Sequence, residues 1–324
     1  PWLGGDAGLD VCYAGDALAL YRIEPDAAAF AAGLRNGDLL ERVDGESVAE
    51  LKAAAEGSGL PKHLIAFDVL QRALARFRGS PGDRVEVEAR APDGERKRAV
   101  VELRRYEGRV TQPLGNVGRM PFAFESGTLE DGVAWMRFNL WFPAAMQEIR
   151  AFVAGLPEDA KGLVIDLRGN PGGVGLMAGG LAGLLVGEQT KLGVTTLREG
   201  YLNFVGFPQR GAFLGPVALL VDEGSCSTSE VFAIGLQEAG RARVFGQRTP
   251  GAALPSLILR LPNDDFLQLA IGDFKTPGGV SLEGCGVIPD EIVEISPVEL
   301  SAGTDTVLEA ASGWIRTTNQ SNHE

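Results

Sequence analysis

Residues 216–238 read PVALLVDEGSCSTSEVFAIGLQE, and this stretch decides the fold that the sequence predicts. The apolar run 216–222 has the continuous hydrophobic character of a strand that is buried on both faces of a parallel sheet. A short polar turn with three serines follows, and a helix begins at about residue 230. A buried strand that turns directly into a helix is typical of an α/β sheet, where ligands lie outside the carboxyl ends of the strands.

A second stretch, residues 162–173, has the same organisation. GLVIDL (162–167) predicts another buried strand, RGNPGG (168–173) predicts a tight turn, and a helix rich in Gly, Ala and Leu is expected over 174–186. Backbone N–H groups at a Gly-Gly turn before a helix can bind an anion, including an oxyanion that develops in acyl transfer. The alternative is a structural turn that needs glycine for its positive φ. No Gly-Lys-Ser/Thr sequence follows, so we do not predict a phosphate-binding loop.

Three serines occupy alternate positions of the first turn: Ser225, Ser227 and Ser229, with Glu230 next. A serine hydroxyl at a strand-to-helix turn lies where local N–H groups can stabilise an oxyanion, so one of the three is a candidate nucleophile. The alternative is that Ser227 or Ser229 caps the helix while Glu230 interacts favourably with its first turn. Two such loops on neighbouring strands favour the catalytic interpretation more than either loop alone.

The first 105 residues predict a separate β-rich domain. Residues 9–23 alternate between apolar and polar positions like a hairpin, and residues 83–104 predict two further strands around a Pro-Asp-Gly turn. Between them the apolar residues recur with a helical period. We expect this helical segment, near 52–80, to be an insertion into the domain.

The α/β core is expected over residues 106–300. Besides the two loops it predicts a strand at 132–138, an amphipathic helix from Pro143 and a hairpin over 253–272. The sequence becomes polar towards its end, and we expect residues 301–324 to form a C-terminal tail.

The composition excludes several classes of protein. With 324 residues the chain is long enough for two domains and a sizeable core. Its net charge of −13 makes nucleic acid and anionic membranes poor partners. No apolar run has the length of a transmembrane helix. The cysteines, Cys12, Cys226 and Cys285, are odd in number and widely spaced, so we predict no disulfide framework, no metal site and no organic cofactor.

Taken together, the motifs resemble the S41 family, the C-terminal processing or tail-specific serine proteases. The resemblance rests on LVIDLRGNPGG (163–173), VALLVDEGSCSTSEVFAIGLQEAGRARVFGQRTPG (217–251) and TPGGVSLEGCGVIPD (276–290), in that order. It extends over about residues 4–292. It implies an α/β fold with a ClpP/crotonase-like core and an N-terminal PDZ-like β-rich domain, and an activity that cleaves the unstructured C-terminal tails of proteins.

Residues 24–48, EPDAAAFAAGLRNGDLLERVDGESV, resemble the PDZ domain of these proteases, with its proline-headed stretch of small residues followed by Ala-Gly-Leu, Gly-Asp and Asp-Gly. Residues 7–10, Ala-Gly-Leu-Asp, resemble the PDZ loop that binds a carboxylate. Gly8 and Leu9 are therefore the expected substrate-binding residues. The implied partner is a peptide or protein with a free C-terminus, whose backbone would add to the sheet as a strand.

The resemblance also assigns catalytic roles. The nucleophile is the middle serine of a pattern like Ser-Ala-Ser-Ala-Ser-Glu, which corresponds to Ser227. The implied oxyanion donors are the N–H group of Thr228 and that of Gly172 or Gly173. The family uses a lysine as general base, in a stretch like Thr-Phe-Gly-Lys-Gly, but at the corresponding position this chain has Ala252. A serine hydroxyl needs a base to lose its proton near neutral pH.

Two side chains are candidates to replace that lysine. Glu230 is one helical turn from the serine and could accept its proton, or could instead support a neighbouring loop. Lys275 precedes a Thr-Pro-Gly-Gly stretch that in the family runs near the substrate groove, or it is simply solvated. We expect His63 on the surface and His323 in the tail, so neither is assigned a role. Cys226 is either an alternative nucleophile or a small buried apolar filler.

The sequence therefore predicts a serine hydrolase that acts by acyl transfer, with no general base assigned. Tail-specific peptide cleavage is the first expectation. One alternative is an esterase of small acyl esters, because an ester has a better leaving group and tolerates a weaker base. The other is a catalytically silent protein that binds peptides through its PDZ-like groove. The family resemblance suggests an exported or periplasmic location.

Overall fold

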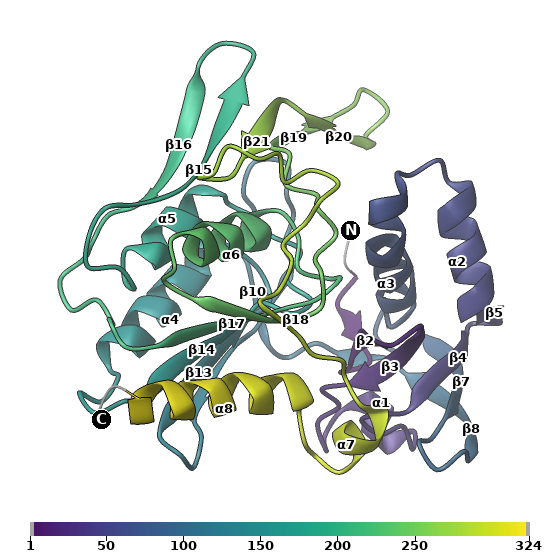
Figure 1. The fold of residues 1–324 in the computed structure, drawn as a ribbon. Coiled ribbons are helices and arrows are strands. Elements are labelled where there is room, and N and C mark those ends of the chain that lie inside the picture. The colour runs from purple at the N-terminus through teal and green to yellow at the C-terminus, as the bar shows by residue number, and fades with distance from the viewer. Residues whose placement is uncertain (1–2, 322–324) are drawn as a thin grey trace. The chain divides into compact units, whose positions relative to one another are not determined.

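The computed structural model describes residues 3–321, and Figure 1 shows how their helices and strands are arranged. The chain is mixed α/β and divides into two units. The N-terminal unit runs to Gly108 and also takes in Val293–Glu309, whereas the core unit comprises Arg109–Ile292 and the residues from Ala310 onward. The division thus falls close to the predicted boundary at 105/106, but residues 293–309 belong to the N-terminal unit.

The N-terminal unit is built on an antiparallel sheet whose strand order is β2-β3-β4-β7-β8, with β5 (Glu46–Ser47) beside β4. Side chains alternate along β7 between the core and the surface, as expected for a strand with one buried face. The hairpins predicted over 9–23 and 83–104 are confirmed. The five strands are β2 (Asp10–Ala14), β3 (Ala17–Tyr21), β4 (Leu39–Val43), β7 (Arg84–Arg90) and β8 (Arg96–Glu102).

The helical segment that we expected to be an insertion is an integral part of this unit. Its helix α2 (Val48–Gly57) begins with a capping box, in which the Ser47 hydroxyl and the Glu50 carboxylate each accept the other residue's backbone N–H. The apolar sides of α2 and α3 (Ile65–Arg76) are buried in the core of the unit, so removing them would expose it. The smaller elements are α1 (Ala28–Ala31), η1 (Lys62–Leu64), α7 (Pro297–Ser301), β1 (Gly5–Asp6), β6 (Arg78–Gly79) and β9 (Arg104–Arg105).

The core unit contains a sheet of six strands in the order β12-β13-β14-β17-β18-β22. Only the β12–β13 pair is antiparallel. The central strands β14 and β17 are buried along their whole length, which confirms the interpretation of their continuous apolar runs. The six strands are β12 (Phe124–Thr128), β13 (Val133–Phe138), β14 (Gly162–Asp166), β17 (Val217–Val221), β18 (Arg243–Gly246) and β22 (Glu291–Ile292).

Helices α4 (Pro143–Ala154), α5 (Leu176–Ala182) and α6 (Thr228–Glu238) cover one face of this sheet in Figure 1. A second, three-stranded sheet has the order β16-β15-β21. The predicted hairpin over 253–272 is confirmed as β19 (Ser256–Arg260) and β20 (Phe266–Ala270). The remaining strands are β15 (Thr190–Leu197), β16 (Tyr201–Gly206), β21 (Gly272–Lys275), β10 (Arg109–Val110) and β11 (Pro121–Phe122).

The C-terminal tail that we expected at 301–324 is helical over most of its length. Helix α8 (Thr306–Ser321) packs on the core unit: Ala311 and Ile315, four residues apart, are fully buried, and the Trp314 ring lies 5.9 Å from that of Phe245. The polar residues at the end of the chain obscure this apolar stripe in the sequence. His323 lies outside the described residues. No helix in the described part of the chain is long and apolar enough to cross a membrane.

We predict that Ile315→Ala destabilises the core unit by about 2–4 kcal/mol, because it removes buried methyl and methylene groups and leaves a cavity. The matched control is Ile292→Ala, since the Ile292 side chain is 66% exposed. Chemical unfolding followed by tryptophan fluorescence measures both. If residues 310–321 were a detached tail, the two variants would unfold alike.

Candidate active site

The loops that follow β14 and β17 lie against each other at the carboxyl ends of these parallel neighbours. The backbone N–H of Cys226 donates to the carbonyl of Asn170 across the two loops, at 3.0 Å. The Asp222 carboxylate accepts the N–H groups of both Gly169, at 2.8 Å, and Gly224, at 2.9 Å. One carboxylate thus holds both turns.

The outer two serines of the turn are structural. Ser225 donates its hydroxyl hydrogen to the Leu167 carbonyl at 2.8 Å. Ser229 donates to the Asn170 carbonyl at 3.0 Å and accepts the indole N–H of Trp141 at 2.8 Å. Both serines are fully buried. Their hydroxyls hold the first loop against the second, so the structural interpretation applies to these two serines.

The middle serine has a different environment. Ser227 is half-buried and immediately precedes helix α6, with φ 57° and ψ −114°. It occupies the N-cap position and forms a capping box with Glu230, so the predicted capping role applies to Ser227 as well. A positive φ is strained for a residue with a Cβ, and such strain of about 1–3 kcal/mol persists only where the surroundings fix it. It is commonly found at functional sites, which makes Ser227 the distinctive serine of the three.

Glu230 fixes this turn through four hydrogen bonds. Its Oε2 accepts the N–H groups of Ser227 and Ala252, both at 2.9 Å, and its Oε1 accepts the Thr249 hydroxyl and the Gly251 N–H. The carboxyl is fully buried, and burial raises its pKa while the four hydrogen bonds act in the opposite direction. Both oxygens are occupied, so the structure favours loop support by Glu230 over the role of general base.

The three predicted oxyanion donors differ in availability. The Gly172 N–H donates to the Asn170 side-chain carbonyl at 3.0 Å and is therefore engaged. Within residues 3–321, the N–H groups of Gly173 and Thr228 have no hydrogen-bond acceptor. The Thr228 hydroxyl donates to the Gly173 carbonyl at 3.1 Å and so holds these two residues together. The N–H groups of Gly173 and Thr228 are therefore the better pair of candidate oxyanion donors.

Gly172 has a steric role instead. Its φ is +99°, and a Cβ built on it would lie 2.7 Å from the Ser227 Cβ and 3.1 Å from the Thr228 nitrogen. Real Cβ atoms do not approach backbone and side-chain carbons so closely. Only glycine at this position lets the first loop approach the serine turn.

Cys226 and the loop at 252 adjoin the serine turn. The Cys226 thiol donates to the Ala252 carbonyl at 3.6 Å, and the Ala253 N–H donates to the Glu283 carboxylate at 3.1 Å. Burial, and then the negative charges of Glu230 and Glu283, raise the pKa of the Cys226 thiol well above its ordinary value. A thiol that stays protonated is a poor nucleophile, so the structure favours the buried-filler interpretation of Cys226.

Glu283 was not singled out from the sequence. It lies in the stretch TPGGVSLEGCG, where no local pattern distinguishes it from a surface glutamate. Its position near the serine turn comes from the way residues 282–286 fold back on the 249–251 loop, with the Gly284 N–H donating to the Gly251 carbonyl at 2.8 Å. Such a long-range contact has no signature in the sequence.

Lys275 and His63, the two other side chains considered as bases, do not belong to the serine turn. Lys275 ends β21, is exposed, and pairs with Val194 of β15. Its interactions within the described residues do not include Ser227. His63, expected on the surface, is half-buried in η1 of the N-terminal unit.

The predicted carboxylate-binding residues precede β2. Gly8 has φ +71°, and its N–H already donates to the Asp6 carboxylate at 2.6 Å. Burial raises the pKa of Asp6, and Asp10 adds a second carboxylate nearby. Leu9 is buried in the core of the unit. This environment does not favour capture of a substrate carboxylate by the Gly8 N–H.

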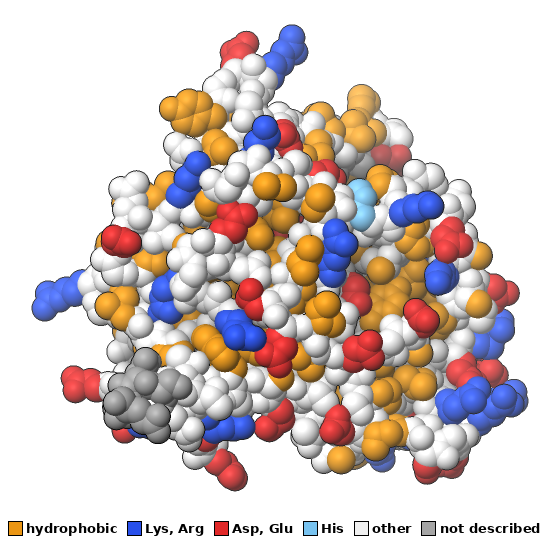
Figure 2. Space-filling view, in the orientation of Figure 1, with side chains coloured by type: hydrophobic (Ala, Val, Ile, Leu, Met, Phe, Trp, Pro, Cys, Tyr) orange, Lys and Arg blue, Asp and Glu red, His pale blue; other side chains and the backbone are white. Residues whose placement is uncertain are grey.

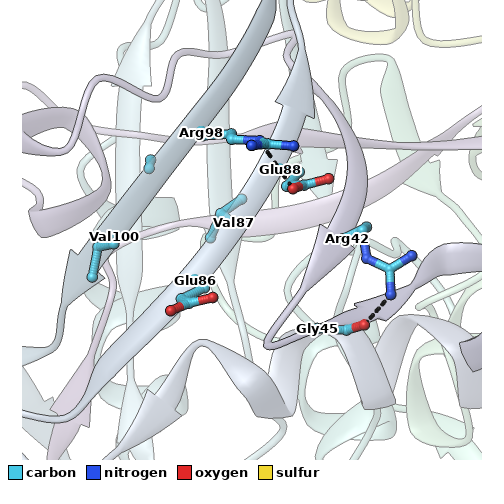
Figure 3. A pocket seen from close by; sticks show the side chains of 8 residues that line it. Arg42, Gly45, Glu86, Val87, Glu88, Arg98 and Val100 are labelled. Atoms are coloured by element: carbon cyan, nitrogen blue, oxygen red, sulfur yellow. Dashed lines mark hydrogen bonds and ion pairs between the residues drawn. The ribbon is translucent and has the colours of Figure 1, made fainter.

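Two hollows in the N-terminal unit are separate from the serine turn. One, of about 270 Å³, lies over β4, β7 and β8, where Arg98 pairs with Glu88 and Arg42 donates to the Gly45 carbonyl (Figure 3). The other, of about 550 Å³, includes the ion pair between Lys97 and the buried Asp38. Among residues 3–321, no cluster of three or more His, Cys, Asp or Glu side chains could hold a metal ion.

Comparison with known proteins identifies relatives. Residues 133–293 match Peptidase family S41. The chain is 28% identical over 271 residues to the carboxyl-terminal-processing protease of Synechocystis sp., which covers 79% of this chain and 61% of that protein. It is 29% identical over 245 residues to the protease of the same name from Picosynechococcus sp., covering 74% and 56% respectively. The chain thus spans about three fifths of the length of these relatives. The chain is thus similar to S41 peptidases over residues 133–293 and to carboxyl-terminal-processing proteases over most of its length.

A solved structure has the same fold. The photosystem II D1 C-terminal processing protease is similar over 94% of this chain and 78% of its own, with a TM-score of 0.57 and 21% identity. The predicted mixed α/β fold with a β-rich N-terminal part is therefore confirmed.

We predict that Gly172→Ala lowers the rate at which a fluorophosphonate probe labels Ser227 by about a hundredfold, the effect of losing an oxyanion donor. The added Cβ would push the serine turn and the Thr228 N–H away from the first loop. Gly200→Ala is the matched control, because Gly200 also has a positive φ, +91°, but open space around it. Intact-protein mass spectrometry follows the labelling. Equal labelling of the two variants would contradict the close approach of the loops.

Glu223 makes the stability of the core unit depend on pH. Burial, and then the charge of Asp222, raise the pKa of Glu223 to about 7. Because the folded-state pKa lies above the unfolded value, the stability contributed by the protonated carboxyl is present in full below about pH 4.5 and is lost as the pH rises through about 7.

We therefore predict that Glu223→Gln is more stable than the wild type at pH 8, by about 2 °C or more in melting temperature, and loses this advantage at pH 5. Glu199→Gln, at an exposed position, removes the same charge and serves as the control. Calorimetry at both pH values makes the measurement. A difference between Glu223→Gln and wild type that is the same at pH 5 and pH 8 would contradict the raised pKa.

Proposed function

We propose that this chain is a serine peptidase of the S41 type that cleaves polypeptides near their C-termini through Ser227. The observation that carries the proposal is the division of labour among the three serines. The hydroxyls of Ser225 and Ser229 are donated to loop carbonyls, whereas Ser227 stands half-exposed in a strained turn beside the N–H groups of Thr228 and Gly173. The named relatives are carboxyl-terminal-processing proteases, which supports this substrate class.

In this proposal the Ser227 oxygen attacks the peptide carbonyl and transfers its proton to a base. The tetrahedral oxyanion accepts hydrogen bonds from Thr228 and Gly173, and each such donor is worth about 3–4 kcal/mol in comparable sites. The C–N bond then breaks as the amine takes up a proton, and water hydrolyses the acyl-enzyme. The buried Glu230 positions the serine turn and the 249–252 loop.

Glu283 is the base that we propose. The two oxygens of Glu230 are filled by four donors, and Lys275 lies on the exposed end of β21. Glu283 accepts the Ala253 N–H at 3.1 Å, and the neighbouring Ala252 carbonyl accepts the thiol of Cys226, the residue next to Ser227. A carboxylate at this position would replace the lysine that is absent from position 252, where this chain has alanine.

The N-terminal unit is proposed to be a PDZ-like domain that delivers the substrate, and the core a ClpP/crotonase-like fold. Strand β2 is an edge strand of its sheet among the described residues. Helix α3 runs beside it, with the Tyr13 hydroxyl 3.4 Å from the Ala66 carbonyl. An extended peptide can add to such an edge through main-chain hydrogen bonds. Because the Gly8 N–H is engaged by Asp6, we propose strand addition to β2 rather than tight capture of the terminal carboxylate.

One observation favours a second candidate function, the hydrolysis of small acyl esters. Position 252 carries a methyl group where the related proteases are expected to have a lysine, and a carboxylate is a weaker base than a neutral lysine. An ester needs less help from a base and an acid than an amide does. The esterase candidate uses the same serine and the same oxyanion donors.

We expect the protein to hydrolyse a short-chain nitrophenyl ester and a peptide with an apolar C-terminus, and Ser227→Ala to lose at least about a thousandfold in rate on both. Glu283→Gln, which still accepts the Ala253 N–H, should lose about a hundredfold or more in rate. Thr128→Ala, on the exposed edge of β12, is the neutral control.

Turnover of the ester alone would select the esterase. Turnover of neither substrate, with no loss on Ser227→Ala, would contradict catalysis and leave peptide binding at β2 as the function. If Glu283→Gln retains the full rate, the base lies elsewhere while the role of Ser227 stands.

A further inference from the structure

The β19–β20 hairpin carries an apolar face that the described residues, 3–321, leave partly exposed. Directly opposed residues of an antiparallel pair project to the same face, and here Leu257 opposes Leu269 while Leu259 opposes Leu267. The exposed fraction of these four residues lies between 37% and 50%. Figure 2 shows hydrophobic side chains gathered over the part of the surface that Figure 1 labels β19 and β20. Four exposed leucines side by side indicate an interaction surface.

The two outer edges of the hairpin differ. On β19, the Asn116 side chain donates to the Ile258 carbonyl at 2.7 Å, so that edge is partly covered. Strand β20 pairs only with β19 among residues 3–321. Its sequence, Phe-Leu-Gln-Leu-Ala (266–270), has no proline and no charge, which are the usual protections of an exposed edge. An unprotected edge of this kind is available to a further strand.

We propose that this strand comes from a second copy of the chain, with β20 pairing antiparallel to its own copy about a two-fold axis at Gln268. The sequence is self-complementary in this register. Leu267 stands opposite Leu269 of the second copy, and the large Phe266 opposite the small Ala270 of the second copy. The leucine faces of the two hairpins then form one continuous apolar surface across a four-stranded sheet.

The charges also favour this antiparallel direction over a parallel one. Asp264 and Asp265, at the tip of the hairpin, fall opposite Gly272 and Ile271 of the second copy, so the acidic tips lie at opposite ends of the interface. A pairing that brought the tips together would place like charges face to face, which is unfavourable. Each copy nevertheless has a net charge of −13, so the dimer should be stronger at higher ionic strength, where this repulsion is screened.

The size of the contact sets the expected affinity. A five-residue edge buries less than the roughly 1,200–2,000 Å² of a standard interface. We therefore expect a weak dimer that dissociates on dilution. A peptide strand could occupy the same edge, but it would have no reason to match the symmetry about Gln268. In the two-fold pairing, the same five residues, 266–270, lie on both sides of the contact.

The test is sedimentation equilibrium of the full chain over a range of concentrations and at two salt concentrations. We expect a species of twice the 34.2 kDa chain mass, with a lower Kd at higher salt. The double variant Leu267→Lys/Leu269→Lys places like charges opposite each other and should raise Kd by about tenfold or more. The matched control, Leu257→Lys/Leu259→Lys, adds the same charges to the same face but on β19, away from the two-fold axis.

Cross-linking tests the register. Gln268→Cys in a Cys285→Ser background should give a covalent dimer on oxidation or with a short bifunctional maleimide, whereas Gln209→Cys should not. Three results would each overturn the proposal: a monomer at concentrations up to about 1 mM, a dimer that the β19 variant weakens as much as the β20 variant, or no cross-link through residue 268. Circular dichroism of each variant checks that it is folded.

Discussion

The buried carboxylate of Glu230 is the interaction on which the candidate site depends. It accepts hydrogen bonds from Ser227, Ala252, Gly251 and Thr249, and therefore joins the serine turn to a loop some twenty residues further along the chain. A buried carboxylate is costly unless its lone pairs are satisfied, and four donors satisfy them. The same hydrogen bond to the Ser227 N–H fixes the strained φ of that residue. The conformation of the serine turn and the order of the 249–252 loop are thus coupled through one side chain.

The sheet supplies the rest of the geometry. Because β14 and β17 are parallel neighbours, their carboxyl ends bring two turns to one edge of the sheet. Hydroxyl groups of the flanking serines, the Asp222 carboxylate and the absence of a side chain at Gly172 then bring the turns into contact. The proposed oxyanion donors, Gly173 and Thr228, come from two different turns, so their spacing depends on every one of these contacts.

The sequence was most informative where a pattern is local. The continuous apolar runs of β14 and β17, the Gly-Gly turn and the N-terminal hairpins were all predictable from the residues themselves. The roles of individual groups were not, because they depend on long-range hydrogen bonds. The sequence could not show that the Gly172 N–H is engaged by Asn170, that Glu230 accepts four hydrogen bonds, or that Glu283 accepts the Ala253 N–H. Helix α8 was missed because its buried positions are few among polar residues.

The central claim is that the three serines have separate roles, two in holding the loops and one in chemistry. Thermal unfolding of Ser225→Ala, Ser227→Ala and Ser229→Ala tests it most directly. The account predicts that the outer two variants each lose about 1–3 kcal/mol of stability, because they leave buried hydrogen-bonding groups unsatisfied. It predicts that Ser227→Ala loses less, about 0.5–1 kcal/mol, because the Ser227 side chain takes part only in the capping box of α6. If Ser227→Ala were as destabilised as the other two, Ser227 would be a structural serine and the account would be contradicted.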